Sequence, residues 1–211
     1  MSRFLLLGAS RGLGHAICHS LLQRGAHITA LIRDAEQAQR LRQAGVDVVE
    51  GDALDPQAVR AACEQAGTEA RVISTLGSFR AAQPVDFEGH RLLIDTMEAT
   101  GLRRLLLVTS LGCGNSWQYL PARARHAFGF EVRLKTLAES WLQTSALEWT
   151  ILRPAGLQDG EATGSARLAP PEEELHGVVR RADVATLAIE LVAQRDTIGQ
   201  ILACVDDTLT R

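Results

Sequence analysis

Short apolar runs alternate with amphipathic stretches along most of this chain. The apolar runs predict buried strands near residues 3–7, 27–32, 46–50, 71–75, 104–109 and 148–152. Runs of this length suit strands that are covered on both faces, and the stretches between them repeat apolar positions at helical spacing. Because strand and helix alternate, the pattern predicts an α/β fold built on a doubly wound parallel sheet.

The regular alternation ends near residue 153. Residues 154–179 are rich in Gly, Pro and Glu and predict a small irregular segment that covers a substrate. A last helix is expected from about Asp183 and a last strand near residues 200–205. With 211 residues, 46% of them hydrophobic, and no internal repeat or linker, the chain is expected to form a single domain over residues 1–211.

The first strand leads through three glycines directly into a helix. Residues 8–14 read GASRGLG, and apolar residues at helical spacing follow. Glycine permits a tight turn and a close approach of the backbone to a ligand, while the free N–H groups of a helix N-terminus bind phosphate. At this place in a βαβ unit the turn predicts a Rossmann fold that binds a dinucleotide diphosphate. The residues expected there are Gly8, Ser10, Arg11, Gly12, Leu13 and Gly14.

The end of the second strand bears on the choice of cofactor, because the ligand of such a sheet lies across the carboxyl ends of the strands. Arg33 stands there and suits a 2′-phosphate, and Arg11 adds a second positive charge. The adjacent Asp34 would instead suit a ribose 2′-hydroxyl. NADP(H) is therefore expected, with NAD(H) as the alternative.

Two further strand ends are expected at the cofactor. Asp52 and Ala53 follow the third strand and would lie at the adenine. Thr75, Leu76 and Gly77 follow the fourth strand and would lie beside the diphosphate. The same residue types also form ordinary turns.

Composition argues against several other classes of function. The formal net charge is −3, aromatic residues make up 4%, and no basic run is present, so nucleic-acid binding is not expected. No apolar stretch reaches membrane-spanning length and the first strand begins at once, which predicts a cytoplasmic protein without membrane contact. The four cysteines form no CxxC pair, and His15 and His19 have no evident third ligand, so no metal site is expected.

Four motifs together resemble the short-chain dehydrogenase/reductase family. Residues 8–14 resemble its GxxxGxG turn, residues 108–110 (VTS) its serine-bearing fifth strand, residues 153–156 (RPAG) its RPxG motif, and residues 181–185 (RADVA) its late helix start. The short chain is most similar to the atypical NAD(P)H-binding group, which includes biliverdin/flavin reductase-like and nitrogen-metabolite-repressor-like proteins. The resemblance covers essentially the whole chain and implies NAD(P)H-dependent chemistry.

The family uses a Tyr-x-x-x-Lys pair, in which the tyrosine passes a proton and the lysine holds the nicotinamide ribose. Lys135 matches the lysine and is the only lysine of the chain, since every other basic residue is an arginine. The resemblance also implies that Ser110 is the active-site serine. Ser110 and Pro154 are expected to contact the cofactor as well.

The tyrosine of that pair is missing. Glu131 stands four residues before Lys135, and the single tyrosine, Tyr119, lies upstream in a predicted loop. The proton donor is therefore open between Tyr119, Glu131, His126 in the loop before the Lys135 helix, and water. A further alternative is a chain that binds the dinucleotide and catalyses nothing.

These observations predict an NADPH-dependent reductase that transfers hydride to a small acceptor, either flat and conjugated or a carbonyl compound. The acceptor is expected between the loop 111–128 and the segment 155–180, where Trp117, Tyr119 and Phe128 would form an aromatic wall. The alternative is a non-catalytic NAD(P)H-binding redox sensor or assembly factor. The protein is expected to be a monomer or a homodimer whose partner is the small-molecule acceptor.

Overall fold

Eight strands form the main sheet in the computed structural model, which describes residues 2–78 and 81–209. Their order is β3-β2-β1-β4-β5-β6-β10-β8, and neighbours are parallel except that β8 runs antiparallel to β10. The expected α/β fold with a doubly wound sheet is confirmed, with one antiparallel edge strand added. The strands are β1 (Arg3–Leu7), β2 (His27–Ile32), β3 (Asp47–Glu50), β4 (Arg71–Ser74), β5 (Arg104–Val108), β6 (Glu148–Pro154), β8 (Arg167–Ala169) and β10 (Gln200–Val205).

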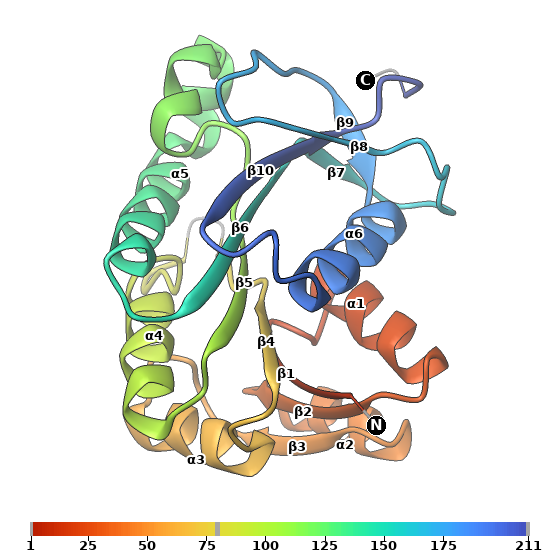
Figure 1. The fold of residues 1–211 in the computed structure, drawn as a ribbon, viewed down its shortest axis with the longest axis vertical. Helices are drawn as coiled ribbons and strands as arrows, with labels where there is room; N and C mark the ends of the chain where they lie inside the picture. Colours follow the sequence, from red (N-terminus) through yellow and green to blue (C-terminus); the bar gives the residue numbers. More distant parts are fainter. Residues whose placement is uncertain (1, 79–80, 210–211) are drawn as a thin grey trace.

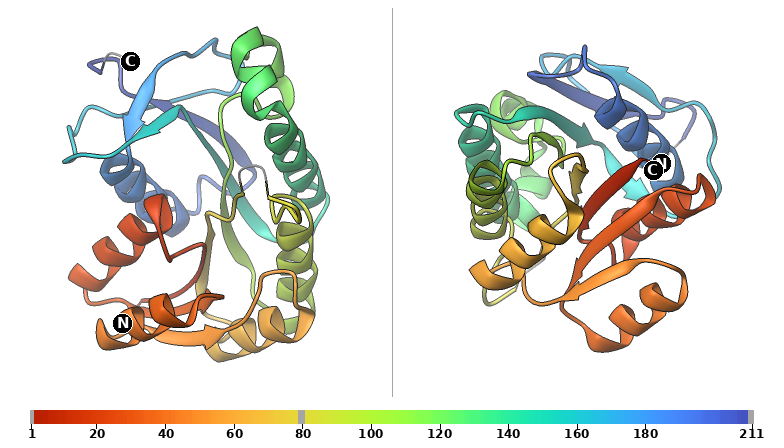
Figure 2. Two further views of the ribbon diagram at one scale, coloured as in Figure 1. Left: turned by 180° about the vertical axis from the view of Figure 1, so that it is seen from behind. Right: turned by 60° about the horizontal axis from the view of Figure 1, so that its bottom comes forward.

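Helices cover both faces of the sheet (Figure 1 and Figure 2). One face packs against α1 (Gly12–Gln23), α2 (Ala35–Gln43) and α6 (Arg181–Ala193), which share one hydrophobic core. The other face packs against α3 (Pro56–Ala66), α4 (Glu88–Thr100) and α5 (Ala122–Gln143), which share a second core. This double burial explains the unbroken apolar runs, since β5 is buried along its whole length.

The strand order reverses between β1 and β4. From β1 the sheet continues through β2 to β3 on one side and through β4 to β5 on the other. The chain connections that follow β1 and β4 diverge to opposite faces, which leaves a crevice at their carboxyl ends. The sheet topology thus provides a ligand site at the end of the glycine turn.

Two segments differ from their predicted irregular form. Residues 154–179 contain β8 and also β7 (Gly156–Gln158), which pairs with β9 (Val178–Arg180) in a small parallel sheet. The predicted loop 111–128 contains a 3-10 helix, η1 (Gly114–Tyr119), and the first turns of α5, with a kink at Phe128. His126 therefore lies in a helix rather than in a loop.

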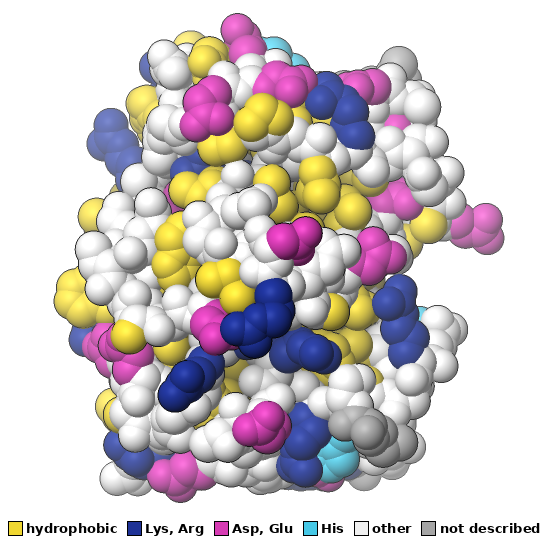
Figure 3. All heavy atoms as spheres, viewed as in Figure 1, with side chains coloured by type: hydrophobic (Ala, Val, Ile, Leu, Met, Phe, Trp, Pro, Cys, Tyr) yellow, Lys and Arg dark blue, Asp and Glu magenta, His cyan; other side chains and the backbone are white. Residues whose placement is uncertain are grey.

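Acidic and basic side chains are mixed on the face shown in Figure 3. Among the described residues, no helix is long and apolar enough to cross a membrane.

Candidate functional site

A cleft of about 860 Å³ opens at the carboxyl ends of β1, β2, β3 and β4. This volume lies within the range of small-molecule and cofactor sites. The cleft includes most of the residues that the sequence assigned to the cofactor. Those that line it are Gly8, Ser10, Arg11, Gly12, Leu13, Gly14, Arg33, Asp52, Ala53, Thr75, Leu76, Gly77 and Lys135.

The glycine turn packs its backbone directly against itself and against the end of β4. A Cβ atom on Gly14 would lie 2.1 Å from the carbonyl oxygen of Gly8, and one on Gly8 would lie 2.6 Å from Thr75 Oγ1. Gly12 has room for a Cβ but adopts a φ of +55°, which a side chain disfavours. The three glycines are therefore needed for two different reasons, close packing and backbone conformation.

The N-terminus of α1 has no side-chain cap. In α2 and α3 the carboxylates of Asp34 and Asp55 accept hydrogen bonds from the N–H groups of Gln37 and Gln57. In α1 the residue at this position is Arg11, whose side chain makes no such bond, and the first turn contains no acidic residue. Its free N–H groups and the positive end of the helix dipole are left for an anion, which fits a dinucleotide diphosphate.

The end of β2 presents an arginine to the cleft. Arg33 Nη1 donates to Asp52 Oδ2 at 3.1 Å, and the Arg33 side chain is 77% exposed. Asp34, which the sequence left as the competing ribose ligand, uses its carboxylate to cap α2. The rim of the cleft therefore offers exposed guanidinium N–H donors, which suit a phosphate group.

Arg181 is a cleft residue that sequence reasoning did not assign. It begins α6, lines the cleft and places its Nε 3.6 Å from the Cβ position of Gly12. Its Nη1 donates to Asp159 Oδ1 at 2.8 Å. The motif at residues 181–185 marked this helix start, but only the packing of α6 beside α1 brings the guanidinium to the glycine turn.

Lys135 reaches the same cleft from α5. Its Nζ donates to the Leu76 carbonyl oxygen at 2.9 Å and lies 3.0 Å from Asp86 Oδ1. Asp86 is fully buried and also accepts from the Ser78 N–H group at 3.0 Å. The lysine side chain is 15% exposed, so this buried carboxylate holds the ammonium at the wall of the cleft.

A neutral histidine binds the main chain of Asp86. His90 is fully buried, with Nδ1 2.7 Å from the Asp86 carbonyl oxygen and Nε2 2.9 Å from Ser74 Oγ. Because a carbonyl oxygen only accepts, Nδ1 carries the hydrogen and Nε2 accepts from the Ser74 hydroxyl. Burial, and secondly the charge of Lys135, lower the pKa of His90 from 6.5 to about 4.

The lowered pKa of His90 predicts a loss of stability in acid. Between about pH 6.5 and pH 4 the unfolded chain binds a proton that the folded chain does not, so the free energy of unfolding falls as the pH falls. The total loss is of order 3 kcal/mol. Urea unfolding across this window should show the decline in the native protein and a flatter profile in His90→Gln. Equal slopes for both proteins would contradict the assignment.

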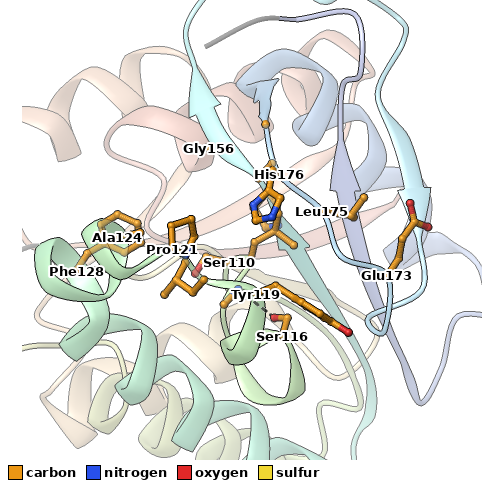
Figure 4. A pocket seen from close by; sticks show the side chains of 16 residues that line it. Ser110, Ser116, Tyr119, Pro121, Ala124, Phe128, Gly156, Glu173, Leu175 and His176 are labelled. Atoms are coloured by element: carbon orange, nitrogen blue, oxygen red, sulfur yellow. Dashed lines mark hydrogen bonds between the residues drawn. The ribbon is translucent and has the colours of Figure 1, made fainter.

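A second pocket, of about 140 Å³, adjoins the cleft (Figure 4). Consecutive residues connect the two, since Thr109 lines the cleft and Ser110 lines the pocket. Its wall is mostly apolar and comes from the loop after β5, η1, the start of α5, the end of β6 and the segment before β9. The lining residues include Ser110, Leu111, Tyr119, Leu120, Pro121, Ala124, Phe128, Pro154, Leu175 and His176.

The predicted catalytic residues do not lie together: one lines the cleft, two line the pocket, and the others line neither. Lys135 lies in the cleft, while Ser110 and Tyr119 line the pocket, where the Tyr119 hydroxyl donates to the Glu172 carbonyl oxygen at 3.1 Å. His126 is exposed on α5 and lines neither the cleft nor the pocket. Glu131 lies on the same helix and is also outside both linings.

The predicted aromatic wall is only partly present. Tyr119 and Phe128 line the pocket, and Pro154 lies there rather than in the cleft. Trp117 does not line it; the centre of its ring lies 5.4 Å from the guanidinium carbon of Arg125 and 5.0 Å from that of Arg133. Cys113, which follows Ser110 closely, is buried, and its burial raises the pKa of the thiol.

The profile of the NAD(P)H-binding family matches residues 8–195, a span that contains both the cleft and the pocket. The chain belongs to the NAD(P)H-binding family. Its fold, its motifs and its relatives place this NAD(P)H-binding protein in the atypical short-chain dehydrogenase/reductase group, as the sequence implied. The family match and the likeness to a solved reductase structure support an oxidoreductase.

Proteins similar to this chain carry three different descriptions. A solved structure of ChuY, an anaerobilin reductase from Escherichia coli O157:H7, is 46% identical, with a TM-score of 0.93 over 99% of this chain and 98% of that one. The uncharacterized sugar epimerase YhfK of Bacillus subtilis is 28% identical over 92% of this chain and 90% of its own length. The photosystem II assembly factor Ycf39 of Cyanophora paradoxa is 29% identical over 74% of this chain, which spans about half (46%) of that protein.

A buried ion pair supports the pocket of this NAD(P)H-binding protein. Arg153, at the end of β6, donates from Nε and Nη2 to the two carboxylate oxygens of Glu139 at 3.0 and 2.7 Å. The same guanidinium donates to Asn115 Oδ1 at 2.7 Å, and Thr109 Oγ1 donates to Glu139 at 2.6 Å. The RPxG arginine thereby joins β5, β6, η1 and α5 behind the pocket wall.

Proposed function

We propose that this protein is an NADPH-dependent reductase that transfers hydride to a flat conjugated acceptor, a linear tetrapyrrole. The observation that carries the proposal is the apolar pocket beside Ser110, which opens next to the cofactor cleft. Its volume, about 140 Å³, is below the range of sites that enclose a whole ligand, so only part of such a molecule would enter it. The proposal is supported by the likeness to a structure named as an anaerobilin reductase.

Each group of residues has a task in this proposal. The free N–H groups at the start of α1, with Arg11 and Arg181, would bind the diphosphate, and Arg33 the 2′-phosphate. Lys135 would hold the nicotinamide ribose, oriented by Asp86. NADPH supplies the hydride when bound. The apolar wall excludes water from the acceptor, and the Ser110 hydroxyl orients it.

Binding and turnover test the proposal separately. Calorimetric titration of the purified protein with NADPH and NADH measures cofactor affinity and preference. Loss of the reduced nicotinamide absorbance is then followed with biliverdin, FMN, a quinone and a simple carbonyl compound. The proposal expects tight NADPH binding and turnover with biliverdin. Binding without turnover on any acceptor would overturn it and favour the redox sensor or assembly factor, which the likeness to Ycf39 supports.

Arg33→Asp should weaken the binding of NADPH far more than the binding of NADH. Loss of a charge-assisted contact of about 1.5–3 kcal/mol should weaken NADPH binding by roughly 10- to 100-fold and leave NADH binding nearly unchanged. Arg24→Asp is the matched control, because Arg24 is exposed at the end of α1 and does not line the cleft. Equal weakening of both cofactors by Arg33→Asp would contradict the role of Arg33.

A further inference from the structure

The acceptor pocket contains a histidine that the Tyr-x-x-x-Lys chemistry does not include. His176 belongs to the segment just before β9, and its ring points toward the interior of the pocket in Figure 4. Its Nε2 lies 3.0 Å from Glu174 Oε1, and its side chain is 47% exposed. The ring therefore has three neighbours at once, namely the acceptor site, a carboxylate and solvent.

The carboxylate of Glu174 fixes the roles of the two ring nitrogens. An ionised carboxylate only accepts hydrogen bonds, so Nε2 carries a hydrogen and points at Glu174. Nδ1 is the nitrogen that remains for a ligand in the pocket. Histidine is also the side chain whose ordinary titration falls near neutral pH, as a proton donor at that pH requires.

The other polar groups near the acceptor are already engaged. Tyr119 donates its hydroxyl hydrogen to the Glu172 carbonyl oxygen. Glu173 is paired with Arg167 at 2.9 Å, and Lys135 is held in the cleft by Leu76 and Asp86. Of the titratable residues that line the pocket in the described parts of the chain, His176 is the one left to supply a proton.

From this arrangement we infer that His176 is the catalytic proton donor to the acceptor, with Glu174 as its positioning residue. The inference rests on the proposed reductase function. It replaces the missing tyrosine with a residue of the segment 155–180, which the sequence predicts beside the acceptor without indicating a catalytic residue there.

The proposed step conserves atoms and electrons. Reduction of a conjugated acceptor adds hydride, supplied by NADPH, to a carbon atom, and the π electron pair moves to a nitrogen or oxygen at the other end of the conjugated system. That atom takes the proton from Nδ1 of the doubly protonated His176 ring, the imidazolium, so one N–H or O–H bond forms as the Nδ1–H bond breaks and the ring loses its positive charge. The neutral ring keeps its Nε2 hydrogen on Glu174 and regains a proton from water on its exposed side.

Few titratable or charged groups near His176 can affect the pH dependence of this proton transfer. The groups that face the ring or its immediate partners are Glu173 and Glu174 on its own segment, Tyr119 on η1, and Arg167 on β8 through Glu173. Among them only the imidazole ordinarily titrates near neutrality. A fall in kcat as the pH rises through that region should therefore follow His176.

The kinetic experiment compares pH profiles with biliverdin as acceptor. His176→Gln should lower kcat by about 100-fold or more and abolish the fall of kcat on the alkaline side, while NADPH affinity stays unchanged. Glu174→Gln should shift the profile with a smaller loss. His19→Gln, on the exposed side of α1, is the matched control and should match the native protein. His126→Gln tests the competing histidine on α5.

A second measurement uses the cofactor-free protein. The imidazole resonance of His176, assigned by its absence in His176→Gln, should shift when biliverdin is added, and that of His19 should not. An unmoved His176 signal overturns the inference, as does a native rate and pH profile in His176→Gln or a lost profile in His126→Gln instead. If the native protein binds NADPH but reduces no acceptor, the proposed function fails and the inference falls with it.

Discussion

Replacing Gly14 by alanine should abolish cofactor binding and destabilise the fold. The new Cβ would lie 2.1 Å from the Gly8 carbonyl oxygen and 2.6 Å from Thr75 Oγ1. The first of these is a backbone atom that no side-chain rotation can move, so β1, α1 and the end of β4 must separate. A cost of about 3 kcal/mol or more is expected, the upper end of what overpacking causes. Urea unfolding and NADPH titration measure the two effects.

Gly89→Ala is the matched control for this substitution. Gly89 is also buried and helical, but its Cβ position is 3.4 Å from the nearest atoms, which is ordinary contact. The helix propensity of alanine exceeds that of glycine, so this variant should be as stable as the native protein or slightly more stable. If Gly14→Ala behaved like Gly89→Ala and still bound NADPH, the packing of the glycine turn would not be what requires glycine.

Arg153→Met should lower the free energy of unfolding by about 3–5 kcal/mol. Arg153 is 2% exposed and Glu139 1%, so the variant leaves a carboxylate buried without its counter-charge. Arg153→Met/Glu139→Leu should recover much of the loss, because removing both charges avoids the unpaired one. Denaturant unfolding of the two single variants and the double variant gives the coupling energy.

Arg60→Met provides the comparison. Arg60 pairs with Glu64 on α3, where the two side chains are 54% and 58% exposed, and an exposed pair of this kind contributes about 0.5 kcal/mol or less. If Arg153→Met lowered the free energy of unfolding no more than Arg60→Met does, burial would not make the fold depend more strongly on the Arg153–Glu139 pair.

The strands and the glycine turn were predictable because their signals are local. A strand buried on both faces needs an unbroken apolar run, and β1 to β6 and β10 lie within two residues of the predicted positions. The start of α3 also has a local signal, since the Asp55 side chain caps it and Pro56 occupies its first position. In these elements the local secondary-structure preference of the sequence agrees with the structure that the element adopts in the fold.

The segment after β6 could not be predicted in the same way. β7 and β9 are only three residues each, and each is held by a partner distant in the sequence. Long-range packing likewise brings Arg181 to the glycine turn and His176 to the pocket that Ser110 lines. The motif at residues 181–185 marks a helix start but not where the Arg181 side chain lies, and no local pattern marks His176. The place of each side chain depends on contacts that only the folded chain makes.

The single lysine gives this protein one side chain at which a spectroscopic label can be attached selectively. Lys135 lies at the wall of the cleft, against Leu76 and Asp86, and no other side chain carries a primary amine. Reductive methylation with isotopically enriched formaldehyde would therefore mark this one side chain and the α-amino group. Its methyl resonance would then report directly, without assignment of the remaining spectrum, when a ligand enters the site.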